Sequence, residues 1–195
     1  NSGYQTAHIG KIHMAHKRGK DHIRPGFDYW FSFRGQGHYY PPHDRYTLND
    51  NGRRVPQDGY ITTLLTKKAI QFLEQQNDRQ KPFFLYLSHK AVHGPFTPEP
   101  AYKNSLSGVP VPAPASSMFL SQNKQNRPRW LLDQRNSWHG MDFPLHSGRT
   151  VEWFYRRYCE SLRSVDDSLG AIMEQLKKMG IHDETLVIYM GDNGF

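Results

Sequence analysis

Short runs of apolar residues recur along this chain, and each one leads directly into polar side chains. The three clearest runs are Thr6–Gly10, Phe83–Ser88 and Leu186–Met190. Continuous apolar runs of this length are typical of strands that are covered on both faces, as in parallel sheets. A segment with helical spacing precedes each of the last two runs. This order predicts right-handed crossovers and an α/β fold with a mostly parallel sheet flanked by helices.

The two helical segments are indicated by apolar residues that recur at steps of three and four. The first begins near Ile61 and is expected to end near Asn77, before Pro82 opens the second strand. The second runs from Val151 to Met179, and Gly180 is expected to terminate it. Both patterns place the apolar side chains on one face of an amphipathic helix.

In two long stretches, the apolar residues do not recur at the regular spacing of a helix or a strand. Residues 14–59 are rich in Gly, Pro, His and aromatic residues, and we predict a long loop there with one hairpin around Leu48–Val55, turned by Asn49–Gly52. A second long loop is predicted at about 95–150, where prolines are frequent. Loops of this length are usually lids or binding loops, and disorder is the alternative.

Polar clusters follow the three predicted strands. They are Lys11 with His13, His89 with His93, and Asp192 with Asn193. Groups that follow the carboxyl ends of parallel strands converge in one crevice, where such folds bind ligands. An ammonium group, imidazoles and oxygen donors together predict a metal-assisted site for an anionic substrate.

Each cluster also has a simpler interpretation. Lys11 and His13 are also typical of a surface loop, and His93 of a hydrogen-bonded structural histidine. Asp192 and Asn193 lie between glycines, which is also turn chemistry. The four-residue spacing of His89 and His93 resembles a zinc motif, but the adjacent glutamate that such a motif needs as a base is absent.

Composition narrows the class of partner. The 195 residues carry a formal net charge of +7, which favours an anionic partner, although the basic residues are dispersed as on a solvated surface. The single cysteine, Cys159, excludes an internal disulfide, and its helical spacing favours a core thiol. No apolar run is long enough to span a membrane. On charge alone, three anionic partners stay open: nucleic acid, a sulfated or phosphorylated polymer, and an acidic surface.

The order and spacing of these clusters resemble the type I sulfatases of the alkaline phosphatase superfamily. The resemblance covers nearly the whole chain, and within the family it is nearest to bacterial N-acetylglucosamine-6-sulfatase-like enzymes. The matching segments are Gly3–Thr6, Gly10–His13, Pro25–Asp28, Pro82–Ser88, Val92–Phe96, Ser164–Asp167 and Gly191–Gly194, with the weaker match Trp130–Gly140.

The resemblance implies an alkaline-phosphatase-like fold and a role for each matching residue. Lys11 would contact the sulfate, His13 would take a proton, and His93 would bind the sulfate and help protonate the leaving oxygen. Asp192 and Asn193 would hold calcium. The resemblance also implies a sulfated small molecule or glycan as partner, with no nucleic acid. The family's nucleophile is a formylglycine, made from a Cys or Ser in a Cys/Ser-x-Pro-x-Arg motif.

That motif is absent from these 195 residues. The resemblance therefore implies that residues 1–195 are the central part of one sulfatase catalytic domain, without the nucleophile segment and the C-terminal part. We expect this piece alone to be inactive, and the parent protein to be periplasmic or secreted. In the loop at 95–150, Asn136, Trp138 and His139 are guesses for substrate contacts.

Two other functions fit the same residues. One is the hydrolysis of phosphate or phosphonate esters by a relative in the same superfamily. The other is a basic module that binds an anionic polysaccharide without hydrolysing it. An enzyme would lose turnover when Lys11 is replaced, whereas a binding module would lose affinity in proportion to the lost charge.

Overall fold

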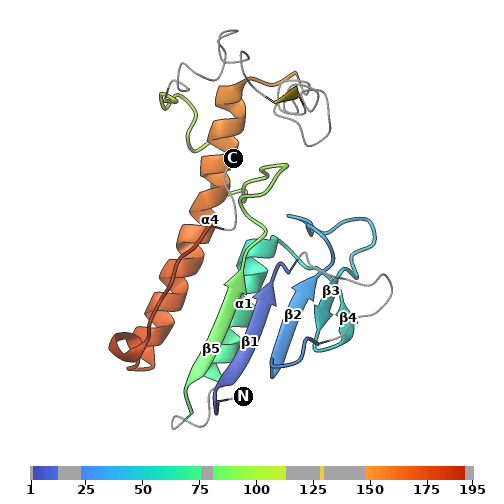
Figure 1. Ribbon diagram of the computed structural model, residues 1–195. Helices are drawn as coiled ribbons and strands as arrows, with labels where there is room; N and C mark the ends of the chain where they lie inside the picture. Colours follow the sequence, from blue (N-terminus) through green and yellow to red (C-terminus); the bar gives the residue numbers. More distant parts are fainter. Residues whose placement is uncertain (1, 13–22, 76–80, 113–127, 130–147, 192–195) are drawn as a thin grey trace. The chain divides into compact units, whose positions relative to one another are not determined.

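The computed structural model describes residues 2–12, 23–75, 81–112, 128–129 and 148–191. They form two compact units, one from residues 1–93 and 164–195 and the other from Gly94–Arg163. The described elements are β1 (Gln5–Gly10), β2 (Tyr29–Phe33), β3 (Leu48–Asp50), β4 (Arg53–Val55), α1 (Ile61–Glu74), β5 (Phe83–Ser88), α4 (Val151–Lys178) and the short 3₁₀ helix His182–Glu184 (Figure 1).

The first unit is built on a mixed five-stranded sheet in the order β4-β3-β2-β1-β5. β1 pairs in parallel with both β5 and β2, and the register aligns Gly10 with Ser88 on one side and with Ser32 on the other. β2, β3 and β4 pair antiparallel. The α/β class is as expected, and the parallel part consists of β5, β1 and β2, whose carboxyl ends therefore share one edge.

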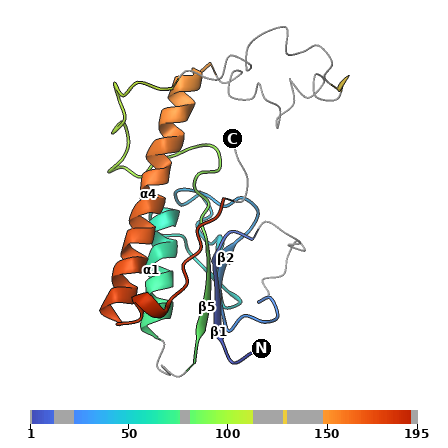
Figure 2. The same cartoon turned by 60° about the vertical axis from the view of Figure 1, so that its left-hand side comes forward.

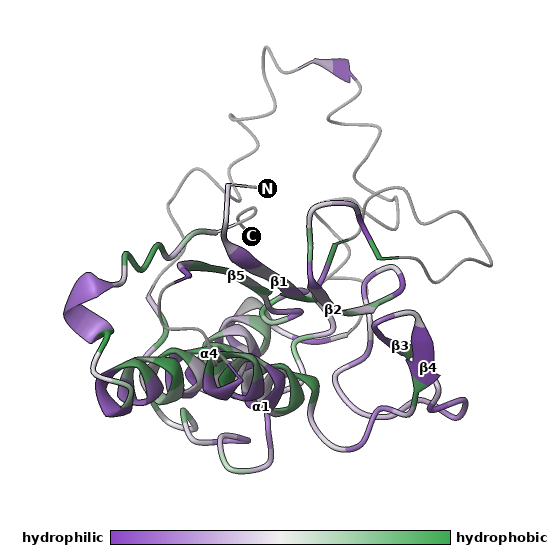
Figure 3. Ribbon diagram, turned by 90° about the horizontal axis from the view of Figure 1, so that it is seen from below, coloured by the Kyte–Doolittle hydropathy of each residue, from purple (hydrophilic) through white to green (hydrophobic). Residues whose placement is uncertain are grey.

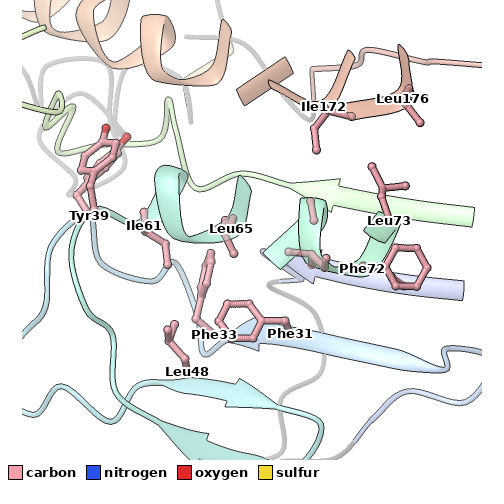
Figure 4. Packing of buried hydrophobic residues seen from close by; sticks show 14 residues of the cluster. Phe31, Phe33, Tyr39, Leu48, Ile61, Leu65, Phe72, Leu73, Ile172 and Leu176 are labelled. Carbon is pink, nitrogen blue, oxygen red and sulfur yellow. The ribbon is translucent and has the colours of Figure 1, made fainter. Parts of the chain in front are cut away.

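The α1 helix and the last part of α4 lie on one face of this sheet (Figures 2 and 3). The apolar face predicted for α1 is buried there, and the core also takes in Ile172 and Leu176 of α4. Both helices match their predicted positions. Figure 4 shows the sheet residues Phe31, Phe33 and Leu48 facing Ile61, Leu65, Phe72 and Leu73 of α1.

The opposite face carries an aromatic cluster. His8 of β1 is fully buried and stacks on Trp30 of β2, with ring centroids 4.3 Å apart. Phe27 and Tyr86 contact the same imidazole edge-on. Because side chains alternate along a strand, β1 directs Ala7 and Ile9 to the helices, whereas His8 points to this second face.

The hairpin predicted around Leu48–Val55 is confirmed as β3 and β4. Asp50 pairs with Arg53, so the connection is the two residues Asn51 and Gly52, both with positive φ. Asn-Gly in that conformation suits the twist of a tight hairpin. The Asn51 side chain also accepts a hydrogen bond from the Trp30 amide at 2.8 Å, which joins the hairpin to β2.

Three expectations about strands were wrong. β2 lies within residues 14–59, where the sequence predicts a loop, although the aromatic residues of β2 are typical of strands. β5 is covered on one face only in the described structure, with Phe84 51% exposed. Leu186–Met190 forms no strand among the described residues, and Leu186 is 84% exposed. A strand needs a partner for its backbone hydrogen bonds, and no described strand pairs with this run.

The second unit contains the beginning of α4 and the turns before it. Phe96 packs edge-on against Phe154 and contacts Tyr158, with ring centroids 5.9 and 6.0 Å away. The turns over residues 100–108 are held to the helix by hydrogen bonds from Arg157 to Asn104 and from the Leu106 amide to Glu160. This part of the predicted long loop is therefore ordered against α4.

Candidate active site

Lys11 is placed at the carboxyl edge of the parallel strands by its neighbour Gly10. Gly10 has φ +119°, and a Cβ there would overlap the carbonyl oxygen of Ser88. Only glycine allows this approach of β1 to β5. The Lys11 amide continues the ladder by donating to the Ser88 carbonyl at 2.7 Å. Lys11 itself is half-buried.

A second lysine at this edge was not predicted. Lys90 lies two residues past the end of β5 and is only 3% exposed. Burial, and then the positive charge of Lys11, lower the pKa of Lys90 to about 8. The position of Lys90 was open to prediction, because Lys90 follows an apolar strand just as Lys11 does; its burial was not.

Tyr39 supports this lysine and the backbone of His93. The Lys90 ammonium lies 4.7 Å from the centre of the Tyr39 ring, a cation–π contact. The Tyr39 hydroxyl donates to the His93 carbonyl at 2.7 Å, and the His93 amide donates to the Lys90 carbonyl at 2.9 Å. Burial raises the pKa of Tyr39 well above its ordinary value, so the hydroxyl remains protonated and a donor.

The structure separates the two histidines that the sequence grouped together. His93 is exposed at the edge that also carries Lys11. His89 instead lies between the sheet and the helices, with Nε2 3.0 Å from the hydroxyl of Ser168 on α4. Burial lowers the pKa of His89 to about 4, so it is neutral at physiological pH. Its place in this network fits the structural interpretation.

The remaining predicted site residues lie outside the described residues. They are His13, Asp192 and Asn193, together with the guesses Asn136, Trp138 and His139. In the described part of the chain, no group of three or more His, Cys, Asp or Glu side chains could hold a metal ion. No described helix is long and apolar enough to cross a bilayer. Cys159 is half-buried.

The fold and the described site define an α/β protein with a basic, anion-attracting cluster at the carboxyl edge of parallel strands. Two ammonium groups close enough to repel each other favour a bound anion, because the anion offsets their repulsion. The sequence profile of the Sulfatase family matches residues 1–195, and the chain belongs to that family.

The relatives of the chain carry the same family name. It is 26% identical to the N-acetylglucosamine-6-O-sulfatase of Bacteroides thetaiotaomicron over 248 residues, covering 100% of this chain and 42% of that protein. An extracellular sulfatase SULF-1 homolog of Drosophila melanogaster is 28% identical, covering 100% of this chain and 17% of that protein. The chain therefore spans less than half the length of these relatives.

Solved structures agree on the fold. One that superposes with a TM-score of 0.66 and 26% identity is a complex with its substrate D-glucosamine-2-N,6-O-disulfate, and it matches 94% of this chain and 46% of its own. The alkaline-phosphatase-like fold class and the partial domain expected from the resemblance are confirmed by this neighbour.

Proposed function

We propose that the protein containing this chain hydrolyses sulfate esters of carbohydrates. The observation that carries the proposal is the pair of ammonium groups, Lys11 and buried Lys90, at the ends of adjacent parallel strands. A sulfate group between or beside them offsets their mutual repulsion. The family membership and the sulfated substrate bound to the structural neighbour support a sulfate ester rather than another anion.

The proposed roles follow the family resemblance. Lys11 contacts the sulfate, His13 takes a proton during the reaction, and His93 binds the sulfate and helps protonate the leaving oxygen. Donors and cations aimed at a developing oxyanion usually supply the largest catalytic contribution. The Lys90–Tyr39 contact and the Tyr39–His93 hydrogen bond support this assignment because they hold the His93 backbone beside the basic cluster.

We further propose that Asp192 and Asn193 are calcium ligands, since carboxylate and amide oxygens suit this cation. Bound calcium would supply positive charge that offsets the negative charge of the substrate. The nucleophile, a formylglycine by family resemblance, would come from outside residues 1–195. These residues would then be the central part of a catalytic domain, inactive by themselves. The extracellular relative favours a secreted or periplasmic location.

Replacing Lys11 tests the catalytic role. We expect Lys11→Ala in the full-length protein to lower kcat for an aryl sulfate at least about 100-fold, with a much smaller change in KM, because the lysine would act on charge that develops in the transition state. Initial rates with aryl sulfate and aryl phosphate, in calcium-containing buffer, provide the measurement. The matched control is Lys67→Ala, which removes an exposed lysine of α1.

The outcomes separate the competing functions. Faster turnover of aryl phosphate than of aryl sulfate by the wild-type protein would identify a phosphoesterase. If the wild-type protein hydrolyses neither ester and Lys11→Ala only weakens binding of a sulfated polysaccharide, the binding-module hypothesis holds instead. Wild-type turnover in both His13→Ala and His93→Ala would remove the catalytic assignment of these histidines.

A further inference from the structure

Gln57 is a polar residue buried in the segment that leads into α1, and it is only 1% exposed. Its side-chain amide donates to three main-chain carbonyls, those of His38 at 3.1 Å, Tyr39 at 3.3 Å and Gly59 at 3.4 Å. Such bonds are costly to break, because a buried polar group would be left without a partner. Gln57 therefore holds residues 38–39, in the loop between β2 and β3, against the residues before α1.

The main chain and the ring of Tyr39 are both held in this loop. The Tyr39 carbonyl accepts from Gln57 and also from the main-chain N–H of Ile61, the first residue of α1, at 2.9 Å (Figure 4). Tyr39 is 4% exposed, and its ring stacks on the Tyr60 ring with centroids 5.8 Å apart. The position of Tyr39 is thus tied to the start of α1.

The hydroxyl of Tyr39 connects this loop to the candidate active site. It donates to the His93 carbonyl at 2.7 Å, across 54 residues of sequence. The main-chain N–H of His93 donates to the Lys90 carbonyl at 2.9 Å, so hydrogen bonds hold the His93 main chain on both sides of its Cα. The backbone from which the His93 imidazole projects is therefore fixed by Tyr39, and Tyr39 is fixed by Gln57.

We propose that Tyr39 and Gln57 are positioning residues for His93. The inference rests on the proposed sulfatase function, in which His93 helps protonate the leaving oxygen. In that step the bond between sulfur and the ester oxygen breaks, the electron pair stays on the oxygen, and the imidazolium gives the oxygen a proton. The proton donor must lie within hydrogen-bond reach of the oxygen, so a small displacement of His93 slows this step.

This role predicts an effect that depends on the leaving group. The oxygen of a sugar leaves as an alcohol and needs a proton as the bond breaks, whereas 4-nitrophenolate leaves readily without one. A displaced His93 therefore slows hydrolysis of a sugar sulfate more than hydrolysis of 4-nitrophenyl sulfate. A smaller fraction of folded protein slows the hydrolysis of both esters equally.

Tyr39→Phe in the full-length protein tests the proposal, because it removes the hydroxyl and keeps the ring that contacts Lys90. We expect kcat for N-acetylglucosamine 6-sulfate to fall about tenfold and kcat for 4-nitrophenyl sulfate less than about threefold, with little change in either KM. Tyr29→Phe is the matched control: it removes the hydroxyl that bonds Asp50, away from His93. It should leave the ratio of the two kcat values unchanged.

Gln57→Met tests the more distant residue, because methionine has a similar length and no N–H to donate. We expect the same selective loss on the sugar sulfate, about threefold, since the Ile61 bond to Tyr39 remains. Gln71→Met, at an exposed glutamine of α1, is the matched control. If Gln57→Met fails to fold, Gln57→Asn replaces it, which keeps the amide on a side chain one methylene shorter.

A His93→Ala background shows whether the effect passes through His93. There, Tyr39→Phe should cause no further selective loss, because the group that it positions is gone. A selective loss that persists in this background would overturn the proposal. Equal losses on both esters in Tyr39→Phe, or no loss on either, would overturn it as well.

If the wild-type protein hydrolyses neither ester, the sulfatase function fails, and NMR of histidine-labelled protein tests the positioning alone. The His93 ring signal is assigned as the one missing in His93→Gln. We expect Tyr39→Phe and Gln57→Met to shift this signal and Tyr29→Phe to leave it in place. A His93 signal that is unchanged in both Tyr39→Phe and Gln57→Met would reject the positioning role.

Discussion

At the residue scale, Gly10 sets the distance between the ends of β1 and β5. We expect Gly10→Ala to destabilise the protein by at least about 3 kcal/mol, because it adds a steric clash with the Ser88 carbonyl to the strain of a positive φ. Gly26→Ala is the matched control: Gly26 has φ +94°, but a Cβ there meets no atom within 4 Å. Chemical denaturation of the full-length protein measures both. Equal losses of unfolding free energy in Gly10→Ala and Gly26→Ala would show that the close approach to Ser88 has no cost of its own.

The same scale shows what the sequence pattern left open. His89 and His93 both follow the same apolar strand, and the pattern does not distinguish them. The structure directs His89 to Ser168 between sheet and helices, and leaves His93 exposed at the edge with Lys11. The burial of Lys90 was likewise not predictable, because it depends on the Tyr39 ring, about fifty residues earlier in the chain.

At the scale of elements, a buried ion pair joins α4 to the turns before it. Glu160 is 2% exposed, accepts from Arg157 at 2.9 Å and receives the Leu106 amide at 3.3 Å. We expect Glu160→Gln to lower the free energy of unfolding by about 2 kcal/mol, because the Arg157 guanidinium would lose its charged partner in a buried place. Thermal denaturation and the rate of proteolysis within residues 99–109 measure the loss.

The control for this prediction is Glu174→Gln on the same helix. Glu174 pairs with Lys177 at 2.7 Å, but both side chains are largely exposed. Exposed pairs contribute little, so we expect Glu174→Gln to leave the free energy of unfolding almost unchanged. If both substitutions have the same small effect, the Glu160 pair does not hold the turns to the helix.

The sequence predicted helices and the hairpin correctly, because their apolar spacing and turn residues are strong local signals. It failed for strands, whose formation depends on a partner strand. The spacing of apolar residues located α1 and α4, and Asn51-Gly52 located the hairpin, because these signals are local. The run Leu186–Met190 has the composition of a strand, yet no described strand offers it a partner. Composition does not specify a partner, since backbone pairing is a property of two segments.

At the scale of the whole molecule, stability is expected to fall on acidification. His89 reaches Ser168 of α4, and Ser168 in turn contacts the Thr66 hydroxyl of α1 at 2.7 Å, so one network joins the end of β5 to both helices. Burial lowers the pKa of His89 from 6.5 to about 4. Below pH 6.5 the unfolded chain takes up a proton that the folded protein does not bind.

Between pH 6.5 and pH 4 this difference is expected to cost roughly 3 kcal/mol of folding free energy, with no contribution above pH 7 and no further loss below pH 4. Urea denaturation across this range measures it. His89→Gln should flatten the dependence, since glutamine also reaches Ser168 but does not titrate. His43→Gln, at an exposed histidine, should leave the dependence unchanged. If the free energy of unfolding depends on pH equally in wild type and in His89→Gln, the role of His89 is refuted.

The sequence by itself determined the α/β class, most strand and helix positions, and the polar residues that follow the strands, because these depend on local periodicity and turn chemistry. The tertiary structure alone decided which of those residues share a site. It buried Lys90 against Tyr39, turned His89 away from the edge, and joined Gln57 to the loop that carries Tyr39. Burial, charge repulsion and close approach arise between segments far apart in the chain, so no local pattern encodes them.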